Sequence, residues 1–405
     1  MRPEVSATLR GSGILTINGG SSSIKFALFQ PQDEMRKILS GSIDHIGSSN
    51  SGLVVRGEAA ADNFSRPISA SEHGAAVASL SDWLGERLGD AALLAIGHRV
   101  VHGGAKYWNP QRVTPELLQD LHELISYDPE HLPEELQLIE AFQRRFAKTP
   151  QVVCFDTAFH HDMPRVAQLL AIPRRYEAMG VRRYGFHGLS YAYLMQELEH
   201  LAGSQAARGR VVLAHLGGGA SMAAVIEGRS VDTTMAFTPA AGLMMSTRCG
   251  DIDPGLVSFL SRRASMRTSE FDRMANHESG LLGVSETSSD MQELLAREGS
   301  DERAAEAVAL FCYQVKKSIG AYSAVLGGID SLVFAGGIGE NAPLVRARIC
   351  QGLGFLGIDL SEARNANNAA VISADGSRIT VRVIRTDEAV VIAKAVAAVL
   401  NKSSP

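Results

Sequence analysis

Short apolar runs of β-like composition alternate with helix-like segments along the whole chain. The runs are bounded by Gly, Asp, Asn or Thr, as strand ends commonly are. They read ILTIN, IKFALF, AIGHRVV, VVCFD, VVLAHL, MAAVIEG, LVFAGG and TVRVIRT. Apolar residues spaced three and four apart predict one amphipathic helix over 77–88 and another after Thr114 that extends through Leu124 and Ile125, with Pro115 at its first position. The alternation of strands and helices predicts an α/β architecture.

Two segments about 200 residues apart follow one plan, namely a strand, a glycine turn with a small hydroxyl residue, and a second strand. They are ILTINGGSSSIKFALF at 14–29 and VLAHLGGGASMAAVIEG at 212–228. This duplication predicts two related domains, each offering backbone N–H groups to phosphate at its turn. For either turn alone, a simple tight hairpin remains the alternative.

A third glycine segment, LVFAGGIGENAPLVR at 332–346, predicts a strand, a GGIGEN turn and a helix with Pro343 in its first turn. A strand-to-helix glycine turn is typical of nucleotide sites, where phosphate meets a helix N-terminus. The segment has neither the Gly-Lys-Ser/Thr of a P-loop nor the GxGxxG of a dinucleotide site.

Composition narrows the classes of partner. The 405 residues include 39 basic and 44 acidic ones, a net charge of −5, with no basic run, so we expect no nucleic-acid partner. The stretch AVVIAKAVAAVL is too short to cross a bilayer, and MRPEVSATLR has no leader-like apolar core, so we expect no membrane association. The four cysteines match no disulfide or metal pattern. A cytoplasmic protein is therefore expected.

Charged residues occur where α/β proteins build their sites, at strand ends and in loops. Arg99 lies within the apolar strand pattern GHRVVHGG, so it must be paired or reach a cleft, and a structural ion pair is the alternative. Asp156 ends the strand of VVCFDTAFH, where a helix cap is the alternative. His187 stands beside Phe186 in RRYGFHG, an unusual place for a packing histidine, although a structural role stays open.

Two more segments combine charge with turn-forming residues. TPAAGLMMSTRCGDIDPG at 238–255 is too glycine-rich for a helix, and we expect Arg248 to face a cleft from this loop. Near the C-terminus, Thr386 is expected to cap a helix whose first turn carries Asp387 and Glu388.

Taken in order, these segments resemble the acetate and propionate kinase family of actin-like ATPases. Six motifs carry the resemblance from ILTINGGSSSIKF to IRTDEA: NGGSSSIK, GHRVVHGG, FDTAFH, RRYGFHG, TRCGDIDPG and GGIGEN. The resemblance implies a duplicated actin-like (ribonuclease-H-like) two-domain α/β fold with a central cleft. The implied domains are 1–155, completed by a C-terminal helix 389–405, and 156–388, which would bind the nucleotide and form a homodimer.

The implied activity is the reversible transfer of the ATP γ-phosphoryl group to acetate, with Mg²⁺ as cofactor and Mn²⁺ as the alternative ion. A propionate or butyrate kinase and a non-catalytic actin-like ATP-binding module are the alternatives. A carboxylate is already ionised at neutral pH, so the reaction needs no general base but must offset charge repulsion.

The resemblance assigns roles position by position. Asn18 and Glu388 would hold the metal ion. Arg99 and Arg248 would grip the carboxylate and the migrating phosphoryl group, and His187 would stabilise the transition state. Asp156 would orient these partners. The implied acyl pocket consists of Val101, Phe186 and Pro239. Ser21, Ser23 and Lys25 would lie near the phosphates, and the other implied nucleotide contacts are His215, Leu216, Gly217, Gly218, Gly219, Asp290, Met291, Gln292, Gly337, Ile338, Gly339, Glu340 and Asn341.

Four positions depart from the family's usual residues. Tyr127 stands where the family has a histidine, Gly218 replaces an asparagine, Gln292 replaces an arginine, and Asp387 replaces an asparagine. The changes at Gly218 and Gln292 imply an altered grip on the nucleotide, and Asp387 would add a negative charge beside the metal ion.

Overall fold

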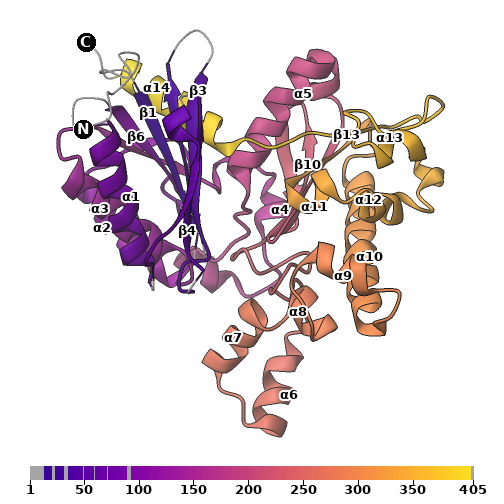
Figure 1. Ribbon diagram of the computed structural model, residues 1–405. Helices are drawn as coiled ribbons and strands as arrows, with labels where there is room; N and C mark the ends of the chain where they lie inside the picture. The colour runs from indigo at the N-terminus through magenta and orange to yellow at the C-terminus, as the bar shows by residue number, and fades with distance from the viewer. Residues whose placement is uncertain are drawn as a thin grey trace. The chain divides into compact units, whose positions relative to one another are not determined.

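The computed structural model describes residues 13–20, 23–31, 35–48, 50–58, 60–70, 72–88 and 93–402. It separates into two compact units. The N-terminal unit comprises the described residues up to Ala158 together with those from Asp387 onward, and the central unit runs from Phe159 to Thr386. Each unit contains one β-sheet and several helices (Figure 1).

In its described part, the N-terminal unit has an eight-stranded sheet of order β5-β4-β3-β2-β1-β6-β8-β7. Strands β1 to β5 form an antiparallel meander, β6 and β8 run parallel to β1, and the short β7 is antiparallel to β8. The strands are β1 (Gly13–Gly19), β2 (Ser23–Gln30), β3 (Arg36–Asp44), β4 (Gly52–Gly57), β5 (Phe64–Pro67), β6 (Leu93–Val100), β7 (Gln111–Arg112) and β8 (Gln151–Phe155).

Helices cover both faces of this sheet. They are α1 (His73–Leu88), α2 (Pro115–Glu123), α3 (Leu132–Arg145) and α14 (Glu388–Lys402). Ile96 shares a buried cluster with side chains of α1 and α3. The next residue, Gly97, points to the opposite face, where an added Cβ would lie 2.5 Å from Ile392 of α14. Glycine at this position therefore allows α14 to pack closely on the strand.

The central unit has a five-stranded sheet of order β11-β10-β9-β12-β13. Helix α5 packs on β9, and side chains of α5 share a buried cluster with β9, β10 and β12. The strands are β9 (Val211–Leu216), β10 (Ala220–Ile226), β11 (Arg229–Thr233), β12 (Ser331–Ala335) and β13 (Thr380–Val383). The helices are α4 (Arg165–Gln168), α5 (Gly188–Arg208), α6 (Gly255–Ala264), α7 (Thr268–His277), α8 (Gly280–Ser285), α9 (Met291–Arg297), α10 (Glu302–Val325), α11 (Gly336–Asn341), α12 (Pro343–Cys350) and α13 (Glu362–Ala366).

The two sheets share a five-strand plan, which confirms the repeat seen in the sequence. In β3-β2-β1-β6-β8, as in β11-β10-β9-β12-β13, three antiparallel strands are followed by two parallel ones. The predicted hairpins are β1–β2 and β9–β10, and each ends in a glycine turn. Ser21, which the resemblance places near the phosphates, lies outside the described residues.

Three local predictions need correction. GGIGEN is the short helix α11 rather than an open turn, because Gly336 takes a φ of 76° and the chain coils directly after it. Thr386 does not cap α14, since Asp387 Oδ1 accepts the Val390 N–H. The helix capped by Thr114 ends at Glu123, so Leu124 belongs to a following 3₁₀ turn.

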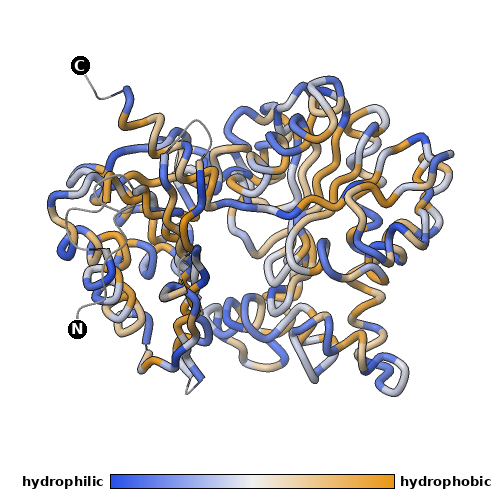
Figure 2. Tube along the Cα trace, turned by 45° about the horizontal axis from the view of Figure 1, so that its top comes forward, coloured by the Kyte–Doolittle hydropathy of each residue, from blue (hydrophilic) through white to orange (hydrophobic). Residues whose placement is uncertain are grey.

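Apolar residues concentrate along the strands of both sheets (Figure 2). The four cysteines are free thiols, and three of them are buried. Within the described ranges, no helix is both long and apolar enough to cross a membrane.

Candidate active site

Polar side chains gather at the carboxyl ends of three neighbouring strands in the N-terminal unit. Asn18 lies near the end of β1, Arg99 near the end of β6, and Asp156 directly after β8. Glu388 joins them from the first turn of α14, and Glu135 from α3. Open α/β sheets bind ligands at this edge. We refer to these five residues as the N-terminal cluster.

Arg99 links two acids of this cluster. Its Nη2 lies 2.7 Å from Asp156 Oδ2, and its Nη1 lies 2.9 Å from Glu135 Oε1. The other oxygen of Glu135 accepts the Val101 N–H at 2.8 Å. The ion pair that the sequence offered as an alternative is therefore present. Asp156 binds Arg99 rather than serving as a helix cap, in keeping with an orienting role.

Glu135 was not predicted from the sequence, although a signal existed. It lies on α3 beside Leu132, Leu136 and Ile139, which are all buried, and it is itself only 2% exposed. An acid on the apolar stripe of a helix is rarely buried unless it is paired. This pattern could have identified Glu135 as a partner of a buried cation.

The N-terminal cluster contains three acids and one arginine, and two of the acids have raised pKa values. Burial raises the pKa of Glu388 to about 7, and repulsion from Asp156 adds to this, while Arg99 and Lys25 act against it. Burial likewise raises the pKa of Glu135 to about 8, against the attraction of Arg99. A bound cation would favour the ionised form of both acids.

The donor set of this cluster fits magnesium. Asn18 Nδ2 donates to Glu388 Oε2 at 2.8 Å, which leaves the Asn18 carbonyl oxygen and the second Glu388 oxygen as hard ligands. Nowhere in the described part of the chain do three or more His, Cys, Asp or Glu side chains form a metal-binding group. Mg²⁺ commonly uses only one or two carboxylates, with water and phosphate completing its shell.

Three more residues that the sequence singled out lie in the N-terminal unit. Lys25 pairs with Asn18 in the β1–β2 ladder and is exposed. Asp387, whose charge is expected beside the metal ion, forms an ion pair with Lys37 and caps α14. The Tyr127 ring meets the His102 ring edge to face, with centroids 5.5 Å apart.

His98 has a structural role. Its Nε2 lies 2.8 Å from the side-chain oxygen of Gln151, and burial lowers its pKa to about 4. The ring is therefore neutral at physiological pH and serves the packing of β6 on β8.

In the central unit, two histidine rings stack beside the second glycine turn. The His187 and His215 centroids are 4.3 Å apart, with the ring planes 22° from parallel. His187 Nδ1 lies 2.9 Å from Ser221 Oγ, and His215 Nδ1 lies 2.8 Å from Ser190 Oγ. His187 precedes α5 with a φ of 58°, a conformation that costs a non-glycine residue about 1 kcal/mol or more. Such a residue is often part of a functional site.

Arg248 comes close to this histidine pair. A Cβ added to Gly219 would lie 3.2 Å from His187 Nε2 and 3.9 Å from Arg248 Nη1. The missing side chain of Gly219 thus leaves room for both nitrogen atoms. Arg248 Nη1 also donates to the Pro239 carbonyl at 3.1 Å, and Pro239 is buried.

The two glycine segments of the central unit meet at the ends of β9 and β12. His215 pairs with Ala335 in the parallel ladder, and a Cβ on Gly217 would lie 3.6 Å from the Gly337 nitrogen. At Gly336 a Cβ would lie only 2.7 Å from the Leu216 carbonyl oxygen, so a side chain is excluded there. The predicted nucleotide residues 215–219 and 337–341 are therefore neighbours.

Within GGIGEN, side chains also hold the segment in place. Glu340 Oε1 accepts the N–H groups of Gly336 and Thr386, and Asn341 Nδ2 donates to the Gly337 carbonyl. Arg346, which the sequence did not single out, is fully buried and donates to the carbonyls of Gly339 and Glu340. The signal was an arginine within the apolar pattern of a helix.

The remaining predicted residues occupy varied positions. Asp290 caps α9 by accepting the Glu293 N–H at 3.0 Å, Met291 is buried and Gln292 is exposed. Val101 is buried in the N-terminal unit and Phe186 in the central unit, where the Phe186 carbonyl accepts from His160 Nε2. The shared acyl pocket stays a prediction.

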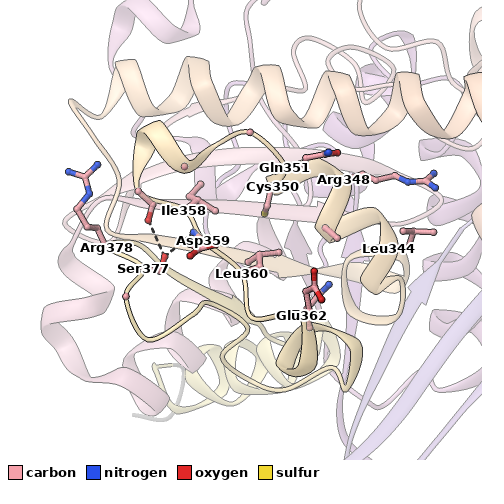
Figure 3. Close-up of a pocket in the computed structure, with 16 residues that line it drawn as sticks. Leu344, Arg348, Cys350, Gln351, Ile358, Asp359, Leu360, Glu362, Ser377 and Arg378 are labelled. Atoms are coloured by element: carbon pink, nitrogen blue, oxygen red, sulfur yellow. Dashed lines mark hydrogen bonds between the residues drawn. The ribbon is translucent and has the colours of Figure 1, made fainter.

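A hollow of about 950 Å³ lies elsewhere in the central unit, along α12 and α13 (Figure 3). Arg348 and Arg378 flank it at opposite ends, and Arg348 is bound to Glu298 at 2.6 Å. The hydroxyl of Ser377 bridges the Gly357 carbonyl and the Asp359 N–H. None of the site residues predicted from the sequence lines this hollow.

Replacing Glu135 is expected to destabilise the N-terminal unit. Glu135→Ala should lower the free energy of unfolding by about 3 kcal/mol, because it breaks a buried ion pair and removes the acceptor of the Val101 N–H. Glu135→Gln, which keeps one acceptor oxygen, should cost about 1 kcal/mol. Urea denaturation measures both values, and equal losses would contradict the role assigned to the acceptor oxygen that glutamine retains.

Comparison with known proteins places this geometry in context. The model of the Acetokinase family matches residues 13–394. An acetate kinase from Rhodopseudomonas palustris is 44% identical over 386 residues, covering 94% of this chain and 96% of the relative. The crystal structure of a propionate kinase from Francisella tularensis has a TM-score of 0.88 at 34% identity, covering 95% of this chain and 98% of that one. For the acetate kinase of Porphyromonas gingivalis the TM-score is 0.84 at 35% identity, with 96% and 100% covered.

These matches span nearly the whole length of both partners and agree with the duplicated five-strand plan of the two units. The chain therefore belongs to the Acetokinase family of phosphotransferases with a carboxyl acceptor, and it has the actin-like two-domain α/β fold.

Proposed function

We propose that this protein is an acetate kinase that reversibly transfers the γ-phosphoryl group of ATP to acetate, giving acetyl phosphate and ADP. The observation that carries the proposal is the approach of His187 Nε2 and Arg248 Nη1 to the same point beside Gly219. An arginine and a histidine nitrogen beside a glycine turn suit an incoming phosphoryl group, whose oxygens carry the charge in the transition state.

The chemistry explains why arginines take the place of a general base. An ionised carboxylate is already a nucleophile, but bringing it to about 4 Å from a phosphoryl oxygen costs roughly 4 kcal/mol per charge pair at an effective dielectric of 20. We assign Arg248 to the migrating phosphoryl group and Arg99 to the carboxylate. Asp156 and Glu135 hold the Arg99 guanidinium by its two terminal nitrogens.

Asn18 and Glu388 are the proposed holders of Mg²⁺, supported by their hard oxygen donors and by the three acids that gather around the single Arg99. When bound, the ion would neutralise phosphate charge. The nucleotide is assigned to the adjoining segments 215–219 and 337–341, where glycines leave the backbone accessible. Gly218 has no side chain to contact the nucleotide, so the N–H groups of the turn and GGIGEN provide the main contacts.

The oligomeric state and the cellular location are proposed from other features of the chain. We propose a homodimer formed through the central unit, because α6 has no buried residue and exposes Leu256, Val257 and Phe259. Helices α6 and α7 also project from the rest of this unit (Figure 1). We place the enzyme in the cytoplasm, where ATP is available and the four free thiols stay reduced.

A hydroxylamine trap tests the activity. Purified protein with ATP, Mg²⁺ and acetate should form acetohydroxamate, because hydroxylamine captures acyl phosphates, and omission of ATP should abolish the signal. Propionate and butyrate are tested in parallel, since a propionate kinase is a structural relative and one methylene is worth only about 1 to 3 kcal/mol. A higher kcat/KM for propionate than for acetate would identify propionate as the substrate in place of acetate. Silence with all three acids would favour a non-catalytic ATP-binding module.

A further inference from the structure

Both histidines of the stacked pair are held in the same way. Each uses Nδ1 to bind a serine hydroxyl, and each serine binds a second hydroxyl behind it. Ser221 Oγ is bonded to the Tyr191 hydroxyl as well as to His187 Nδ1, and Ser190 Oγ is 2.8 Å from Thr386 Oγ1. In each histidine the serine hydroxyl therefore binds Nδ1, and Nε2 is the ring nitrogen that can contact a ligand.

The chain of hydroxyls behind His187 has a preferred direction. Tyr191 and Ser221 are both fully buried, so each of their hydroxyl protons must be donated to an acceptor within the protein. A phenol is a stronger hydrogen-bond donor than an aliphatic hydroxyl and a weaker acceptor. Tyr191 therefore donates to Ser221 Oγ, and Ser221 donates to His187 Nδ1. With Nδ1 acting as acceptor, the neutral ring carries its proton on Nε2.

We propose that Ser221, backed by Tyr191, is a positioning residue that fixes His187 as its Nε2–H tautomer. This inference rests on the proposed function for its kinetic consequence. Nε2 is the atom that lies beside Gly219, next to Arg248. In the other tautomer, Nε2 would present a lone pair to the phosphoryl oxygens and repel them. The serine thereby decides whether His187 donates a hydrogen bond or opposes the reaction.

The position of Ser221 shows why a separate residue is needed to fix the orientation of the His187 ring. The backbone of His187 is left-handed, which sets the direction of its Cβ but not the rotation of its ring. His215 stacks on one side of the ring and limits its tilt. The bond to Ser221, which lies on β10 opposite His215 in the ladder, fixes the remaining rotation.

Three variants test the proposal on the full-length protein. Ser221→Ala removes the donor to Nδ1, and kcat should fall about 10-fold, with the KM values for ATP and acetate changed less than about 2-fold. Tyr191→Phe removes only the second hydroxyl and should lower kcat by a smaller factor. Ser323→Ala is the matched control, because Ser323 is also buried but bonds only the Ile319 carbonyl of its own helix. It should leave kcat unchanged.

A spectroscopic readout separates tautomer control from general damage. In two-bond ¹H–¹⁵N spectra, with the His187 signals assigned from a His187→Gln sample, the wild-type ring should show protonated Nε2 and unprotonated Nδ1. Ser221→Ala should shift these signals toward a mixture of tautomers. An unchanged tautomer in Ser221→Ala, or an Nδ1–H ring in the wild type, would overturn the proposal.

The spectra also separate this proposal from the proposed function. Should the hydroxylamine trap stay silent with every acid, the tautomer can still be measured on the wild type and on Ser221→Ala. Acyl phosphate formation combined with equal kcat values for wild type and Ser221→Ala would refute the role of Ser221 alone.

Discussion

Replacing Arg248 by alanine is expected to lower kcat/KM for acyl phosphate formation by about 10³-fold or more, the typical effect of an arginine that stabilises a transferring phosphoryl group. Arg248 Nη1 lies beside Gly219 together with His187 Nε2, so the variant would lose half of this donor pair. The loop should keep its shape, because backbone bonds hold it, including Cys249 N–H to the Ala275 carbonyl and Asp251 N–H to the Gly242 carbonyl.

Asp156→Asn is the comparison for this prediction, and it should cost less than Arg248→Ala. The amide oxygen can still accept from Arg99, and Glu135 still binds the other terminal nitrogen of the guanidinium. Arg248→Lys should fall between the two, since it keeps the charge but loses the planar fork. Steady-state rates at saturating ATP and magnesium rank the three variants. An asparagine variant more damaged than the alanine variant would show that Asp156 does more than orient Arg99.

The duplicated plan was predictable from the sequence because its hairpins are made of strongly apolar strands around glycine turns. Most residues of strands β1, β2, β9 and β10 are buried, so their apolar composition reveals them. Strands β3, β4, β5 and β11 were not predicted. They mix polar and apolar residues because they lie toward one edge of each sheet, where part of each strand faces water.

Caps and buried charges were harder to predict, because their identity depends on three-dimensional partners. Thr386 and Asp387 are both good capping residues, and in the fold Asp387 caps α14 while the Thr386 hydroxyl is bonded to Ser190. Glu135 and Arg346 are buried charges whose partners lie 36 and up to 22 residues away along the chain. No local pattern in the sequence specifies such pairings.

The sequence predicted the motifs of the candidate site one by one, but it did not predict how their side chains lie relative to one another. The resemblance named His187, His215, Arg248 and Gly219, while the stacking of the two rings and the approach of Arg248 to Gly219 depend on the β9–β10 hairpin and on the left-handed turn at His187. The serines that bind the histidines carry no sequence signal, because buried serines are common on strands and in first helical turns.

Gly219→Ala is expected to lower kcat by about 100-fold while leaving the thermal unfolding temperature nearly unchanged. The new Cβ would lie 3.2 Å from Nε2 and 3.3 Å from Cε1 of His187, which is tighter than an ordinary contact. The ring would have to move by a few tenths of an ångström, away from the geometry that Ser221 imposes. Gly219 does not have a positive φ, so the methyl group adds no backbone strain and the damage should stay local.

Gly218→Ala is a closely matched control, one residue earlier in the same turn. Its Cβ would meet only Ser246 Oγ, at 3.8 Å, which is an ordinary contact, and its φ is also not positive. We therefore expect kcat to stay within about 2-fold of the wild type. Because the two variants add the same methyl group to one turn, a large difference between them must come from what each methyl meets. If Gly218→Ala lost as much activity as Gly219→Ala, the turn as a whole would be the sensitive element, and the loss in Gly219→Ala would no longer support phosphoryl binding beside His187 and Arg248.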